Sequence, residues 1–501
     1  MIKVSNGKYK IVYIGAGSFR FAIPCTMNIL DFAKDFNPIE LWLVDIDDYS
    51  LSLMREVVWR MVQLHKKEIE IHSTVNRRIA LPDADYVLIS ISVGIQKSEW
   101  IDIHIPLKFG IPQNTGDTVG PGGIFRSLRT IPAIVEILKD IKELCPNALV
   151  LNYTNPQSTT MLSTYQTAPN VQSVGLCHEL FYLESKKFAK VLKYCEINTL
   201  AKKEFQILYG GLNHFSWITK FEYGGEDLYP ILREAADYLY KSGKFGRPFN
   251  FYLLKMTGYL TYVEDRHVAE FLPKYYNYFN HWDKPFNMTD LRSVNRVNLE
   301  RTFMYSLIKA LKRKRFSWII KLFLRPTEGI EKALLMAKDK ERNISRHHVC
   351  NVLNDGTIPS LPSNCIIEIP CYFENGKIQK VKIGNFPNPI KEWIFLHATN
   401  QQLVVDAALS GNLDDLIKAL LADPMCGFIE DEEKIKALML NMLYYQKEWL
   451  PNFSESIPNY SDLKKMKYYI EKSELCKRNV ARKEKYHPDS SLKVKSWPYN
   501  N

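Results

Sequence analysis

Short runs of apolar residues alternate with helical patterns through the first 200 residues of the chain. Nearly continuous apolar runs of this kind are typical of parallel strands that helices cover on both faces. The runs lie at 11–14, 41–44, 84–91, 148–152 and 171–176. This pattern predicts an α/β domain with a doubly wound parallel sheet.

The second half of the chain has a mixed pattern. Strand-like runs lie at 205–218, 364–370 and 380–384, and helical periodicity covers 230–271, 390–421 and 432–450. The first of these strand-like runs contains Gly210-Gly211, where we expect it to bend. The sequence therefore predicts a doubly wound domain over 1–200, an α+β domain over 201–455 and a tail over 456–501.

Composition agrees with a soluble enzyme of two domains. The chain has 501 residues, of which 46% are hydrophobic and 24% are charged, and its nine cysteines lack a close-spaced ligand pair. Scattered cysteines in odd number favour a reducing compartment, and neither a signal peptide nor a membrane-length apolar run is visible. We expect a cytoplasmic protein without a membrane partner.

Much of the net charge of +11 lies in a basic insertion at 299–345 and in the tail. A basic amphipathic helix in the insertion could contact a membrane or nucleic acid. The solvated face of a helix packed on its own domain is the more common origin of such a pattern. We therefore expect no nucleic-acid partner.

A glycine turn joins the first predicted strand to a helical pattern. Gly15-Ala16-Gly17-Ser18 follows the apolar run 11–14, and the next predicted strand ends in Asp45. This is the context of a dinucleotide-binding loop, and the Asp45 carboxylate would bind the adenosine ribose of NAD and disfavour NADP. The third glycine of the usual fingerprint is replaced by Arg20. We predict an NAD site, with an ordinary strand-to-helix turn as the alternative.

A second glycine-rich loop runs from Thr115 to Gly123, with four glycines around Asp117, and precedes a helical pattern. Such a loop lets backbone approach a ligand closely, and the start of a helix favours anions. We therefore expect its amides to suit an anionic ligand. A tight turn followed by two solvated arginines, Arg126 and Arg129, is the alternative.

Several short motifs accompany these loops. They are Asp117-Thr118-x-Gly120-Pro121-Gly122-Gly123-x-x-Arg126-x-Leu128-Arg129, Asn155-Pro156, Gly175-Leu176-Cys177-His178, Gly211-Leu212-Asn213-His214, and Glu264-Asp265-Arg266-His267-x-x-Glu270-Phe271-x-Pro273. In this order they strongly resemble glycoside hydrolase family 4, and the resemblance covers about residues 8–450. The basic insertion and the tail are unlike the family.

The resemblance implies an NAD-binding Rossmann-like domain followed by an α+β catalytic domain, as in lactate and malate dehydrogenases, in a homodimer or homotetramer. It also implies a glycosidase that needs NAD and Mn²⁺ or another divalent transition metal. In the family, NAD⁺ oxidises C3 of the sugar and a base removes the C2 proton. The glycosidic oxygen then leaves, water adds and the hydride returns, which differs from the two-carboxylate scheme of most glycosidases.

The resemblance also assigns roles to individual residues. Cys177 and His214 would bind the metal, because thiolate and imidazole suit a divalent transition metal. His178 would be the acid for the leaving oxygen, and Asp265, or else Tyr259, would be the base. Taken alone, a buried strand cysteine is more often an inert residue of the core, and a lone histidine is more often simply hydrogen-bonded.

Other residues of the motifs would support the substrate and the base. Asn155 and Asp117 would hold sugar hydroxyls. His267 and Glu270 share a predicted helix with Asp265 and Arg266 and would orient them.

The substrate is the least determined part of the prediction. The sequence of the glycine-rich loop and the pair Cys177-His178 resemble those of family members that act on non-phosphorylated α-glycosides. The arginines near the motifs, Arg126, Arg129 and Arg266, favour a C6 carboxylate, hence an α-galacturonide or α-glucuronide. α-Galactosides and α-glucosides are the alternative substrates. A dehydrogenase of a small hydroxy acid is the alternative function, followed by a non-catalytic nucleotide-binding regulator.

Overall fold

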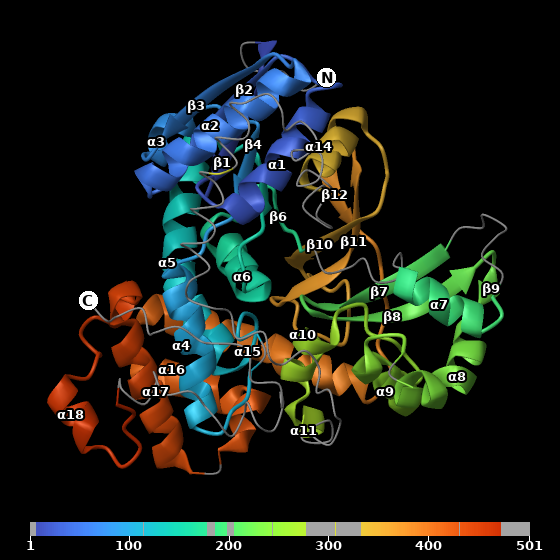
Figure 1. Ribbon diagram of the computed structural model, residues 1–501, viewed down its shortest axis with the longest axis vertical. Helices are drawn as coiled ribbons and strands as arrows, with labels where there is room; N and C mark the ends of the chain where they lie inside the picture. The colour runs from blue at the N-terminus through green and yellow to red at the C-terminus, as the bar shows by residue number, and fades with distance from the viewer. Residues whose placement is uncertain are drawn as a thin grey trace.

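A computed structural model of the chain describes residues 7–113, 115–177, 186–197, 205–242, 244–276, 306, 332–429 and 431–471. Within these residues one continuous sheet of twelve strands runs through the molecule. Helices pack on both sides of its first half and gather around its second half (Figure 1). The fold is mixed α/β, which confirms the predicted class.

The first half of the sheet is parallel. Its strands are β1 (Tyr9–Ile14), β2 (Ile39–Val44), β3 (Ile69–Thr74), β4 (Tyr86–Ile89), β5 (Leu149–Asn152) and β6 (Ser173–Gly175). They lie in the order β3-β2-β1-β4-β5-β6, as in dinucleotide-binding doubly wound sheets. The five predicted runs correspond to five of these strands. The pattern missed β3, an edge strand in which no residue is fully buried.

The helices of the first half cover both faces of the parallel strands. They are α1 (Phe19–Phe32), α2 (Asp48–His65), α3 (Arg77–Ala80), α5 (Gly120–Leu144) and α6 (Gln157–Thr167). Of the other two helices of this segment, α4 (Ile95–Lys108) packs on α5, and α7 (Lys186–Tyr194) packs on the second half of the sheet. Alternate residues of β1 enter different cores, because successive side chains of a strand point to opposite faces. Ile11 and Tyr13 pack with α1 and α2, whereas Val12 and Ile14 pack with α5.

The second half of the sheet is antiparallel. Its strands are β7 (Phe205–Leu212), β8 (Phe215–Tyr223), β9 (Glu226–Asp227), β10 (His348–Leu353), β11 (Ile366–Glu374) and β12 (Lys377–Lys380). β10 pairs with β6 and β11, and β11 pairs with β7, so the two halves form one sheet. The predicted strand at 380–384 is displaced, because β12 ends at Lys380.

The expected bend at Gly210-Gly211 is wrong, because both glycines lie inside β7. The chain reverses at Asn213-His214, where His214 has a left-handed φ of 62°. A Cβ at Gly211 would lie 2.4 Å from the carbonyl oxygen of Phe215. This glycine therefore permits a close approach of two strands instead of a turn.

The remaining helices lie in several places. The helices at 229–257 lie beside the antiparallel strands at the lower right of Figure 1, the helix Lys332–Arg342 packs on α1, and most helices after residue 390 form a group at the lower left. The remaining helices are α8 (Tyr229–Ser242), α9 (Pro248–Thr257), α10 (Asp265–Phe271), α11 (Pro273–Tyr276), α14 (Lys332–Arg342), α15 (Ile390–Ser410), α16 (Leu413–Ala422), α17 (Glu432–Gln446), α18 (Tyr460–Lys465) and the 3-10 helices η4 (Pro424–Phe428), η5 (Lys447–Trp449) and η6 (Pro451–Phe453). The predicted helix at 390–421 is divided in two, because Gly411 adopts a left-handed φ of 67° and ends α15.

The predicted domain boundary stays a prediction, since the two halves share one sheet. Of the basic insertion, residue 306 and residues 332–345 are described. The tail beyond residue 471 lies outside the described residues.

The glycine turn after β1 is fixed by backbone contacts. Gly15 has a φ of 93°, and its N–H donates to the Val44 carbonyl at 2.8 Å. A Cβ at Gly15 would lie 2.0 Å from the Ser90 carbonyl oxygen. The turn therefore requires glycine both for its φ and for its space.

Gly15→Ala should destabilise the protein more than Gly110→Ala. The two glycines have φ values of 93° and 90°, so each alanine costs about 1–2 kcal/mol of left-handed strain. Gly15→Ala adds a backbone clash, whereas a Cβ at Gly110 would meet no described atom within 4 Å. Chemical denaturation of both variants measures the difference, and equal losses would contradict this account of the turn.

Candidate active site

The glycine turn lies against the end of β2. The Gly17 N–H donates to Asp45 Oδ2 at 2.8 Å, and the Asp47 N–H donates to Asp45 Oδ1 at 3.0 Å. Ser18 is the N-cap residue of α1. The structure therefore gathers the predicted nucleotide-binding residues Gly15, Gly17, Ser18 and Asp45 at the carboxyl edge of the parallel strands, where such sheets bind ligands.

The first turn of α5 differs from expectation, because the chain supplies its own acceptors there. The Gly120 N–H donates to Asp423 Oδ2 at 2.8 Å, and the Gly122 N–H donates to Gln113 Oε1 at 2.8 Å. Asp423 is 3% exposed, and this burial raises the pKa of its carboxyl group. The anion expected at this helix start is thus a side chain of the protein itself.

Glu270 on α10 holds the start of the glycine-rich loop. Its Oε1 accepts hydrogen bonds from the N–H groups of Thr115, at 2.7 Å, and Gly116, at 3.2 Å. Burial raises the pKa of Glu270 to about 7. His267, three residues earlier on α10, also faces the loop. These contacts direct both side chains to the loop, whereas the sequence led us to expect that they orient Asp265 and Arg266.

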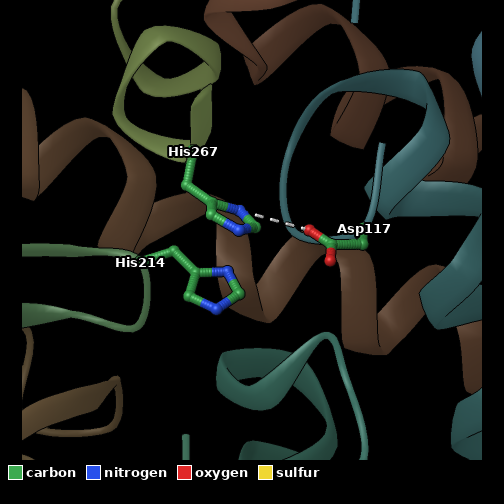
Figure 2. A group of neighbouring side chains, drawn as sticks. All are labelled: Asp117, His214 and His267. Atoms are coloured by element: carbon green, nitrogen blue, oxygen red, sulfur yellow. Dashed lines mark ion pairs between the residues drawn. The ribbon is translucent and has the colours of Figure 1, made fainter. Parts of the chain in front are cut away.

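Three buried side chains from distant segments meet beside the loop. Figure 2 shows Asp117 of the loop, His214 of the β7–β8 turn and His267 of α10 pointing toward one another. His267 Nδ1 lies 3.6 Å from Asp117 Oδ1, and the centroids of the two imidazole rings are 4.0 Å apart. Thr118 Oγ1 donates to Asp117 Oδ1 at 2.8 Å and lies 2.7 Å from His214 Nδ1. The loop thus presents side chains, not amides, to this cluster.

Cys177 extends the cluster from the parallel half of the sheet. It follows β6, and its Sγ lies 3.1 Å from His214 Nε2. The structure therefore brings the two predicted metal-binding residues into contact. They come from different halves of the sheet, so their proximity depends on the whole fold.

The donor atoms of this cluster fit a divalent transition metal. Asp117, His214 and His267 each offer one ligand atom, and these atoms lie within 4.8 Å of one another. His214 belongs to this group and also contacts the Cys177 sulfur, so nitrogen, oxygen and sulfur donors of the kinds that such ions bind lie around one imidazole. His267 was not predicted as a donor, because a single helical histidine carries no information about its direction. The sequence signal that could have indicated its direction is the spacing of three residues between His267 and Glu270, which places both on one face of a helix.

The two arginines predicted to bind substrate are placed differently. The side chain of Arg129 is 1% exposed, and its guanidinium donates to both carboxylate oxygens of Asp102 and to Gln446 Oε1. These contacts join α4, α5 and α17, and they give Arg129 a structural role in place of the expected substrate contact. Arg126 has a 12% exposed side chain and lies 3.3 Å from Glu99.

Of the two candidate bases, Asp265 is held firmly. Its carboxylate accepts hydrogen bonds from the N–H groups of Phe249, at 2.9 Å, and Asn250, at 3.0 Å, at the start of α9. Burial raises the pKa of Asp265 to about 6, near the range in which a carboxylate can act as a base at neutral pH. Tyr259 is half-buried, with its ring centroid 5.3 Å from that of Tyr229.

The last two predicted site residues are His178 and Asn155. His178 lies outside the described residues. Asn155 follows β5, is half-buried and precedes a cis peptide bond to Pro156.

A buried carboxylate that sequence analysis missed holds the turn of His214. Glu368 of β11 is 1% exposed and accepts hydrogen bonds from Asn213 Nδ2 at 2.8 Å, Ser216 Oγ at 2.6 Å and Asn351 Nδ2 at 3.2 Å. These bonds fasten the β7–β8 turn to β10 and β11. A carboxylate inside an otherwise apolar strand pattern was the available signal.

Comparison with protein families identifies the chain. The family 4 glycosyl hydrolase model matches residues 10–194, and the model of the C-terminal domain of that family matches residues 209–426. The chain is a family 4 glycosyl hydrolase. The resemblance carried by the motifs is thereby confirmed.

Relatives of this glycosyl hydrolase match along most of its length. An alpha-galacturonidase of Thermoanaerobacter italicus is 31% identical over 466 residues, which cover 88% of the chain and 98% of the relative. An alpha-galactosidase of Bacillus subtilis is 29% identical over 445 residues, with 89% and 99% covered. The crystal structure of a 6-phospho-alpha-glucosidase from gut microorganisms in complex with NAD and Mn²⁺ has the same fold, with a TM-score of 0.72, 18% identity, and 89% and 99% covered.

Eight cysteines of the glycosyl hydrolase lie within the described residues, and none of them forms a disulfide bond there. None of the helices in the described part of the chain is both long and apolar enough to cross a membrane. The cytoplasmic location and the homodimer or homotetramer stay predictions.

Glu270→Gln should change the pH dependence of stability of the metal-free enzyme, because glutamine keeps an acceptor for both loop amides but cannot ionise. Burial raises the pKa of Glu270 from 4.5 to about 7, so the native state binds its proton more tightly. This stabilisation is complete below about pH 4.5 and is lost as the pH rises through 7, by at most about 1.4 kcal/mol per pH unit.

The measurement is the unfolding free energy of wild type relative to the variant, which should fall from pH 5 to 7.5 and then level off. Glu143→Gln is the control, because Arg78 lowers the pKa of that exposed carboxyl group. If the difference in unfolding free energy between wild type and Glu270→Gln stays constant from pH 5 to 7.5, the raised pKa of Glu270 is contradicted.

Proposed function

We propose that this family 4 enzyme hydrolyses α-linked uronides with NAD and Mn²⁺ as cofactors. The observation that carries the proposal is the 3.1 Å contact between Cys177 Sγ and His214 Nε2, beside the buried carboxylate of Asp117. The glycine turn at Gly15 and Asp45 supports a nucleotide at the carboxyl edge of the same sheet. The solved relative that contains NAD and Mn²⁺ supports both cofactors.

The two cofactors would be held by separate parts of the chain. Cys177 and His214 would bind the cation, and the turn at Gly15, Gly17 and Asp45 would bind NAD. When bound, NAD⁺ would exchange a hydride with the sugar, and the cation would polarise a sugar oxygen.

The residues around the cluster would orient the sugar and move its protons. Asp117 and Asn155 would hold sugar hydroxyls. Asp265, or else Tyr259, would remove the proton from C2, and His178 would protonate the leaving oxygen. The raised pKa of Asp265, about 6, supports a carboxylate that can take up a proton near neutral pH.

The choice of a uronide rests on charge and on the relatives. The alpha-galacturonidase of Thermoanaerobacter italicus supports this substrate class. Arg126 on α5 and Arg266 on α10 belong to the two helices beside the cluster, and the side chain of Arg266 is 32% exposed. A guanidinium binds a carboxylate through two parallel hydrogen bonds, which a hydroxymethyl group cannot match.

Hydrolysis of an aryl α-glycoside should require NAD⁺, a divalent cation and a thiol reductant. Chelation should abolish activity, and Mn²⁺ should restore it. Cys177→Ser should lower kcat/KM by about 100-fold or more, because a serine hydroxyl stays protonated at neutral pH and is a weak ligand. Cys145→Ser, at a buried thiol beyond the end of α5, is the control for the substitution itself.

Two outcomes would count against this assignment. One is full activity of Cys177→Ser after exhaustive chelation. The other is net NADH formation equal to the sugar consumed, which would support the dehydrogenase alternative.

The substrate class can be tested with the aryl α-galacturonide, α-glucuronide, α-galactoside, α-glucoside and 6-phosphoglucoside. A uronide should have the highest kcat/KM. Arg126→Gln and Arg266→Gln test which arginine binds the carboxylate of the uronide. For that residue, the ratio of uronide to galactoside kcat/KM should fall by about 10–100-fold, which corresponds to the loss of a hydrogen bond to a charged group. A galactoside that is turned over faster than both uronides, with a ratio unchanged in both variants, would refute the uronide.

A further inference from the structure

Thr118 lies between a carboxylate and the histidine that contacts Cys177. Its Oγ1 is 2.8 Å from Asp117 Oδ1 and 2.7 Å from His214 Nδ1. A hydroxyl group has one hydrogen to donate but can accept hydrogen bonds through two lone pairs. If the hydroxyl donates its hydrogen in one of these two contacts, it must therefore accept in the other.

The direction of both hydrogen bonds follows from this chemistry. An ionised carboxylate can only accept, so the Thr118 hydroxyl donates to Asp117. The hydroxyl oxygen must then accept from His214, and the neutral imidazole carries its hydrogen on Nδ1. The lone pair of the ring is left on Nε2, the atom that lies 3.1 Å from Cys177 Sγ.

We propose that Thr118 is a positioning residue that fixes the tautomer and the ring orientation of His214, so that Nε2 is the metal-binding atom. This inference rests on the cation site of the proposed function. A histidine ligand binds metal through the ring nitrogen without hydrogen, and its other N–H is held by an outer partner. Here the outer partner is a hydroxyl that Asp117 in turn orients.

Burial makes this arrangement effective. His214 is 1% exposed and Asp117 is 8% exposed, so water competes little for either hydrogen bond. The left-handed φ of His214 and the bonds of Glu368 to Asn213 and Ser216 fix the backbone from which the ring projects. The backbone sets where the ring lies, and Thr118 sets which nitrogen is free.

The test is Mn²⁺ binding to the reduced enzyme without substrate, measured from the electron paramagnetic resonance signal of free Mn²⁺. Thr118→Val removes the hydroxyl and keeps the shape, so Mn²⁺ should bind about 10–100-fold more weakly. Thr118→Ser keeps the hydroxyl and should bind within about 3-fold of wild type. NAD⁺ affinity should be unchanged in both variants, and Mn²⁺ binding should be measured well below the thermal midpoint of each, because loss of a buried hydrogen-bond partner lowers the stability of Thr118→Val.

Thr115→Val is the matched control in the same loop. The Thr115 hydroxyl is buried and has no hydrogen-bond partner among the described residues, so its removal should leave Mn²⁺ affinity unchanged. If Thr118→Val fails to fold, Thr118→Ala tests the same loss with a smaller side chain.

The possible results distinguish the role of the Thr118 hydroxyl from the existence of the cation site. Wild-type Mn²⁺ affinity in Thr118→Val, or an equal loss in Thr118→Ser and Thr118→Val, would overturn the role of the hydroxyl and leave the cation site standing. A wild-type enzyme that does not bind Mn²⁺ would overturn the proposed function and this inference with it.

Discussion

The active-site loop depends on hydrogen bonds from its amides to buried carboxylates elsewhere in the chain. Asp423 accepts from Gly120, and Glu270 accepts from Thr115 and Gly116. A loop rich in glycine has many accessible conformations, and these buried acceptors select one of them. In that conformation the side chains of the loop, not its amides, face the cluster of donor atoms. The orientation of Asp117 and Thr118 therefore follows from acceptors that belong to other segments.

The continuity of the sheet has a similar effect on the other side of the cluster. Cys177 follows a parallel strand, whereas His214 sits in a turn between antiparallel strands. Glu368 lies opposite Gly211 in the pairing of β11 with β7, and from there it bonds the turn. A slip of one residue in this pairing would move Glu368 to the other face of the sheet. The register of the antiparallel half thus determines where His214 lies relative to Cys177.

The features that could be predicted from the sequence are those that local residue patterns encode. The parallel strands and the turn at Gly15 were predictable, because continuous apolar runs and a strand–glycine–helix order are local signals. Gly210-Gly211 was misread, since glycine marks a bend and a close approach equally well. Arg129 was misplaced for a different reason: its partners Asp102 and Gln446 lie 27 and 317 residues away, and no periodicity records such contacts. The pairing of Cys177 with His214 came from family resemblance, and only the fold gives it a distance.

The anchoring of the loop by Asp423 also has a consequence for biosynthesis. About 300 residues separate Gly120 from Asp423, which corresponds to roughly 15–60 s of translation. Until that segment emerges from the ribosome, the loop lacks one of its acceptors and the nascent chain carries Cys177 on an incomplete scaffold. The donor residues of the cluster all precede Asp423 in the chain, so they are synthesised before the acceptor that holds the Gly120 end of the loop in place.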